Sequence, residues 1–63
     1  MEKEYKEEML AGELREMLAF WWTPEETEEN HEAFFERIGQ YADGLSEADV
    51  WRVWETVLEQ EFV

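Results

Sequence analysis

The sequence predicts an all-α protein, a compact three-helix bundle with helices at about residues 2–22, 24–43 and 47–61. Three observations favour it. Apolar residues recur at helical spacing in each of these segments, and residues that commonly start or end helices stand between them. The connections are only about two to four residues long, which favours helices that are neighbours in space. The chain of 63 residues is therefore expected to be a single small acidic helical domain, residues 1–63.

The first expected helix carries one apolar stripe and ends at Trp22, the first residue of the sequence "WTPEE". The stripe occupies positions i, i+4, i+7, i+8 and i+11, which are Leu10, Leu14, Met17, Leu18 and Trp21. Tyr5 and Met9 flank it, and Gly12 falls on the opposite, polar side. We expect this stripe to face the core of the domain.

The second expected helix has two possible starts. In the first, Thr23 is the N-cap, Pro24 is the first helical residue, and Glu26 completes a capping box three residues after the threonine. In the second, Asn30 is the N-cap and residues 24–29 form an acidic loop. The first start also explains part of the acid in this segment, because a helix N-terminus favours negative side chains.

The inward positions of the second helix are His31, Phe34, Phe35, Ile38, Tyr41 and Ala42. Gly44 is expected to end this helix in the left-handed conformation, after Asp43. Ser46 is the expected N-cap of the third helix, with Asp49 three residues later in place of the usual glutamate. The third helix has two apolar stripes, one of Val50, Val53, Trp54, Val57 and Leu58 and one of Trp51, Leu58 and Phe62.

The charge of the chain is its outlying feature. Eighteen acidic residues against five basic ones give a net charge of −13, which creates a strong negative field. Ordinary binding to DNA, RNA or anionic membranes is excluded, because neutralising phosphates requires lysine and arginine. The charge favours a protein partner with a basic surface, such as a nucleic-acid-binding protein. A surface that serves solubility alone is the plainer interpretation.

The compartment is inferred from what the sequence lacks. The chain has no cysteine, so neither a disulfide framework nor a thiolate zinc site is expected. The segment "MEKEYKEEML" is charged and periodic, unlike a secretory signal. No apolar run approaches the roughly 20 residues of a membrane span. We therefore expect a cytoplasmic protein, in the host cytoplasm if a phage encodes it.

The acid is concentrated in the first part of the chain, where twelve of the eighteen acidic residues precede residue 37. Glutamates on a rigid helix can imitate phosphates, because duplex DNA carries one charge per roughly 1.7 Å of its axis. In character, although in no motif, the chain resembles the small acidic proteins that phages use against host nucleases and other DNA-binding proteins. We expect such an inhibitor, with an acidic face made of Glu25, Glu26, Glu28, Glu29, Glu32 and Glu36.

The alternative function rests on aromatic residues that a small core does not need. We define the expected aromatic face as Phe20, Trp22, Trp51 and Phe62. Such a face would make the protein an interaction module: a homodimer, a regulatory subunit, or an antitoxin-like or immunity-like partner. The plainer interpretation is that these side chains cover the ends of the bundle and stay partly exposed.

Catalytic equipment is not expected. Ser46 is the sole serine and is explained as a helix cap, and His31 is the sole histidine, so no catalytic triad or two-histidine metal motif can form. Glu28 stands three residues before His31, a spacing that helical di-metal sites use, but those sites need this motif twice. We therefore expect no enzymatic activity, no metal and no cofactor.

Overall fold

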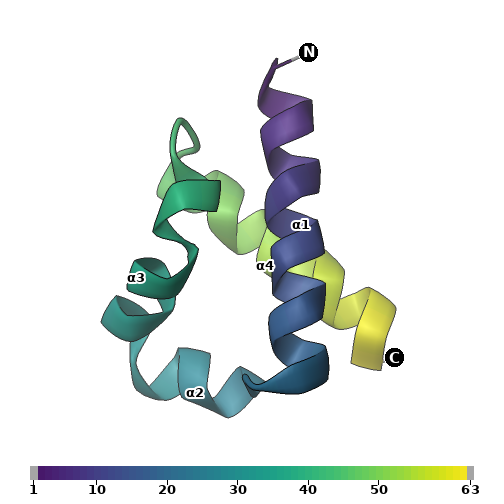
Figure 1. Ribbon diagram of the computed structural model, residues 1–63, viewed down its shortest axis with the longest axis vertical. Coiled ribbons are helices and arrows are strands. Elements are labelled where there is room, and N and C mark those ends of the chain that lie inside the picture. Colours follow the sequence, from purple (N-terminus) through teal and green to yellow (C-terminus); the bar gives the residue numbers. More distant parts are fainter. Residues whose placement is uncertain (1, 63) are drawn as a thin grey trace.

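The computed structural model describes residues 2–62, which form four α-helices and no strand (Figure 1). The helices are α1 (Glu2–Phe20), α2 (Pro24–Glu29), α3 (His31–Ala42) and α4 (Glu47–Phe62). The all-α class is confirmed. The exact three-helix bundle is not, because the short helix α2 accompanies the three longer ones. Among the described helices, none is both long and apolar enough to cross a membrane.

Helix α1 ends two residues earlier than the sequence predicts. The backbone N–H groups of Trp21 and Trp22 both donate to the carbonyl of Met17, at 2.9 and 2.8 Å. The bond from Trp22 spans five residues instead of four, so the chain turns away from helical geometry after Phe20. The sequence predicts that Trp21 faces the core and that Trp22 is exposed, and this turn reverses the two positions. Trp22 is buried, with 9% of its surface exposed, whereas Trp21 is 49% exposed.

The segment expected as one helix over residues 24–43 is divided at Asn30. Thr23 begins α2, since its hydroxyl accepts a hydrogen bond from the N–H of Glu26 at 3.4 Å. The N–H of Asn30 donates to the carbonyl of Glu26 at 3.0 Å and closes α2. The Asn30 side chain then accepts from the N–H of Ala33 at 3.0 Å and begins α3. Both expected caps therefore exist, and the acidic loop of the second interpretation is wrong because this segment is helical.

The turn between α3 and α4 follows the prediction. Gly44 has a φ of +85°, in the left-handed region that glycine tolerates best. The N–H of Asp49 donates to the Ser46 hydroxyl at 3.1 Å, and the N–H of Ser46 donates to the Asp49 carboxylate at 3.3 Å. This is a capping box with aspartate in the third position, and it is confirmed.

Helix α1 packs against both α3 and α4, and α4 crosses α1 at a steep angle (Figure 1). The buried apolar core consists of Leu10, Leu14, Met17, Trp22, Phe34, Ile38, Val50, Val53, Trp54 and Val57. Aromatic rings join α3 to α4. The ring of Phe34 stacks on Trp51, with centroids 5.3 Å apart, and meets the Trp54 ring at 64° with centroids 5.0 Å apart. Large rings thus fill the space between these two helices.

Candidate protein-binding surface

The six glutamates of the acidic face all have exposed side chains on α2 and α3. Glu25 and Glu26 lie in the first turn of α2, and Glu32 lies in the first turn of α3. In each case the partial positive charge of the helix N-terminus favours the carboxylate. The division at Asn30 creates a second helix start within this short segment. Local helix chemistry therefore tolerates a density of negative charge that one continuous helix would favour less.

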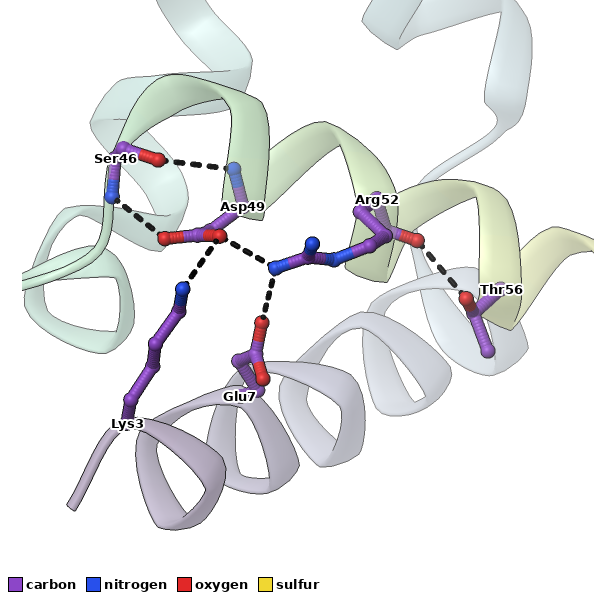
Figure 2. Close-up of polar contacts among 6 residues, drawn as sticks. All are labelled: Lys3, Glu7, Ser46, Asp49, Arg52 and Thr56. Carbon is purple, nitrogen blue, oxygen red and sulfur yellow. Dashed lines mark hydrogen bonds and ion pairs between the residues drawn. The ribbon is translucent and has the colours of Figure 1, made fainter. Parts of the chain in front are cut away.

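Most of the basic side chains lie elsewhere, near the start of α1 and the start of α4. Figure 2 shows an Asp49 network that joins these two helices. Lys3 Nζ lies 3.2 Å from the Asp49 carboxylate, and Arg52 bridges Asp49 to Glu7, whose oxygen lies 2.9 Å from the guanidinium. Ser46 completes the network through its two capping hydrogen bonds. These ion pairs hold the first half of α1 against the first half of α4.

The contacts within the Asp49 network shift the pKa values of Asp49 and Arg52. Hydrogen bonding to Ser46 is the largest influence on the pKa of Asp49 and lowers it, and Lys3 lowers it further. Partial burial of the carboxylate opposes this change. Hydrogen bonding to Glu7 and the charge of Glu7 raise the pKa of Arg52. The lowered pKa keeps Asp49 ionised at more acidic pH than a free aspartate, and its contacts belong to the fold and not to the acidic face.

Among the remaining basic side chains of residues 2–62, Arg15 and Arg37 form no ion pair with the glutamates of the acidic face. Arg15 donates to the side chain of Gln60 at 2.6 Å. Arg37 places its guanidinium over the ring of Trp21, with its Cζ atom 5.3 Å from the ring centroid.

Lys6 pairs with Glu2 at 3.9 Å, within α1. Within residues 2–62, ion pairs therefore join α1 to α4 or lie inside one of these helices, and the glutamates of the acidic face take part in none. Since α2 lies beside the C-terminal end of α1, the glutamates of the acidic face on α2 lie towards the opposite end of that helix from Lys3 and Glu7 of the Asp49 network (Figure 1).

The structure does not bring the four residues of the aromatic face onto one surface. Phe20 and Phe62 are 80% and 60% exposed at the ends of α1 and α4. Trp51 is half-buried and stacks on Phe34. The exposure expected for Trp22 is wrong, because its ring belongs to the core and its Nε1–H donates to the buried hydroxyl of Thr27 at 2.7 Å.

A groove that the sequence did not predict lies where the end of α1 meets α2 and α3. We call it the Trp21 groove; its volume is about 400 Å³. Its lining residues are Trp21, Trp22, Glu26, Glu29, Asn30, Ala33 and Arg37. Two residues of the acidic face thus stand beside two tryptophan rings. This groove is not evident from the sequence because the apolar pattern places Trp21 on the inward stripe of α1. Helical periodicity does not apply to Trp21, since the helix ends at Phe20.

The residues considered for catalysis are not brought together. The Ser46 hydroxyl accepts the N–H of Asp49 as a cap. The ring of His31 lies against Trp51, with centroids 5.0 Å apart. Glu28 and His31 lie on different helices, on either side of Asn30. Across residues 2–62, no three histidine, aspartate or glutamate side chains gather in a way that could hold a metal ion.

No protein-family model matches the sequence, and searches among curated proteins and solved structures found no significant match.

Proposed function

We propose that this protein binds and inhibits a nucleic-acid-binding protein or nuclease by presenting carboxylates where that protein expects phosphates. One observation carries the proposal. The glutamates of the acidic face are exposed and, among the described residues, form no ion pair, while the basic side chains are engaged with other groups. A face of this kind offers its full charge to a basic partner.

The arrangement suits electrostatic recognition. Carboxylates that form no ion pair among the described residues attract a basic surface over a range of about 8–10 Å at physiological salt. Complementary charge of this kind accelerates association and selects the partner. The rigid caps at Thr23 and Asn30 support the proposal because they fix the backbone from which the carboxylates project. A fixed array loses less conformational entropy on binding than a flexible acidic segment does.

The test is capture of partners from the lysate of the native host on immobilised protein, followed by competition with duplex DNA. We expect the captured protein to be a DNA- or RNA-binding protein, to elute when salt is raised, and to be displaced by the DNA. A captured protein that is indifferent to both salt and nucleic acid would contradict the proposal, because mimicry requires that the two ligands share one site.

A second candidate is supported by the exposure of Phe20 and Phe62, at 80% and 60%. Exposed aromatic rings commonly anchor protein interfaces. In this case the protein is an interaction module or homodimer, and the acid serves solubility. Light scattering over a dilution series tests the homodimer: its mass should depend on concentration and the dependence should vanish in Phe20→Ala or Phe62→Ala. A monomer at every concentration removes the homodimer.

A further inference from the structure

We propose that the Trp21 groove seats one arginine side chain of the protein partner, with the guanidinium on the face of Trp21 and its N–H groups directed to Glu26 and Glu29. This inference rests on the proposed function in one respect, that the partner is a basic protein. It adds a specific anchor to a surface that otherwise recognises charge alone, and it commits to one chemical group.

The walls of the groove are held in place before any partner arrives. The buried Trp22 ring is fixed by its hydrogen bond to Thr27. Its centroid lies 6.4 Å from the centroid of the Phe34 ring in the core. Trp21 meets Trp22 edge to face, with centroids 6.0 Å apart and planes at 82°. The half-exposed Trp21 ring is therefore supported on one side by a rigid neighbour, which limits the entropy lost when a ligand stacks on it.

The chemistry of the groove selects a cation that is also planar. An aromatic face attracts a cation through its quadrupole, and a carboxylate attracts it through charge. Glu26 and Glu29 line the groove and form no ion pair among the described residues. A guanidinium can stack its plane on the indole and donate two parallel hydrogen bonds to one carboxylate, whereas an ammonium group is a point charge with no plane to stack and no parallel pair of donors. The groove therefore favours arginine over lysine.

The protein itself shows that the Trp21 ring accepts a guanidinium. Arg37 lines the groove, and its Cζ atom lies 5.3 Å from the centroid of that ring. Arg37 thus already occupies the Trp21 ring. An arginine of the partner must either displace Arg37 or bind to the same ring beside it. It follows that removing Arg37 should strengthen binding of an arginine ligand, and by more than the loss of one positive charge explains.

Arg15 provides the matched control for this effect. It is also exposed and carries the same charge, but it bonds to Gln60 on α4 and does not line the groove. Phe20 provides the control for the aromatic ring, because it is exposed, adjacent to Trp21, and likewise outside the groove lining.

The experiment compares two probe peptides of equal charge, Lys-Lys-Lys-Lys-Lys and Lys-Lys-Arg-Lys-Lys, with acetylated and amidated ends. Their affinities are measured by titration monitored through the tryptophan indole N–H signals in NMR spectra. We expect the arginine peptide to bind roughly two- to tenfold more tightly than the lysine peptide and to shift the Trp21 signal most. Equal affinities of the two peptides for the unmodified protein would overturn the proposal.

The variants locate the preference. Trp21→Ala should abolish the preference for the arginine peptide, and Phe20→Ala should retain it. Arg37→Ala should increase this preference. Arg15→Ala should increase the affinity for both peptides equally. The double variant Glu26→Gln with Glu29→Gln leaves both rings in place, so it tests the groove even if Trp21→Ala unfolds; it should reduce the preference. A preference that survives in the Trp21 variant, or one that is undiminished in the double variant, would contradict the proposal.

Failure of this inference is distinguishable from failure of the proposed function. Equal peptide affinities would remove the arginine anchor but leave the captured partner displaceable by duplex DNA. Conversely, a captured partner that DNA does not displace would remove phosphate mimicry while the arginine preference of the groove persisted.

Discussion

Arg37 holds its guanidinium over the indole ring of Trp21, with 5.3 Å between its Cζ atom and the ring centroid. Arg37 follows Glu36 directly in α3, so it is the basic residue nearest in sequence to the acidic face. Its charge is directed to an aromatic ring and forms no ion pair with a described carboxylate. The glutamates of the acidic face are consequently not ion-paired with Arg37, and the ring of Trp21 holds a cation.

Removing charge from the acidic face should weaken partner binding. We expect the quadruple change of Glu25, Glu28, Glu29 and Glu32 to glutamine to lose about 2 kcal/mol, at about 0.5 kcal/mol for each exposed ion pair, or roughly thirtyfold in Kd. The salt dependence of binding should decrease in the same variant. Calorimetry with the captured partner at two salt concentrations measures both.

The matched control changes four exposed glutamates elsewhere, namely Glu16, Glu55, Glu59 and Glu61. This control removes the same net charge from the chain. Binding lost equally in both quadruple variants would mean that total charge, and not the acidic face, attracts the partner.

The hydrogen bond between Trp22 and Thr27 should stabilise the fold. Thr27→Val keeps the shape of the side chain but leaves the buried Trp22 Nε1–H without its acceptor, so we expect a loss of about 1–3 kcal/mol in the free energy of unfolding. Urea denaturation measures this. Thr56→Val is the control, because Thr56 is exposed and its hydroxyl donates only to the carbonyl of Arg52. Equal losses of unfolding free energy in the two variants would show that the buried hydrogen bond stabilises the fold no more than the exposed one does.

Asn30 should be needed for the division between α2 and α3. Asn30→Ala removes the acceptor for the N–H of Ala33, so we expect a loss of about 1 kcal/mol in unfolding free energy. Asn30→Asp keeps an oxygen in that place and should retain most of the stability. Thermal unfolding followed by circular dichroism compares the three proteins. An alanine variant that is more stable and more helical would show that α2 and α3 merge when the cap is absent.

The Asp49 network should make stability depend on pH. The fold lowers the pKa of Asp49, so its contribution is fully present above the unfolded value of about 3.9 and is lost as pH falls through the folded value. We expect Asp49→Asn to lower Tm clearly at pH 7 and the difference from the unmodified protein to shrink steadily at pH values below about 4. Glu55→Gln, an exposed residue outside the network, should show no such trend. A difference in Tm that is constant with pH would exclude this role for Asp49.

The sequence was sufficient for features that depend on neighbouring residues. Helix starts at Thr23 and Ser46 and the left-handed Gly44 follow from local capping and turn chemistry, which acts within a few residues. The inward positions of α1 at Leu10 and Leu14 follow from helical spacing, which holds as long as the helix continues. The all-α class follows from these two kinds of signal together.

Only the tertiary structure decided which tryptophan is buried and where the basic side chains are engaged. Trp21 and Trp22 are adjacent, and the choice between them depends on where α1 ends and on the buried Thr27 that accepts the Trp22 indole N–H. The bridge from Arg52 to Glu7 joins residues far apart in the sequence, so no local pattern could indicate it. The physical reason is the same in both cases: packing and charge pairing depend on distances between helices, and these are set only when the helices assemble.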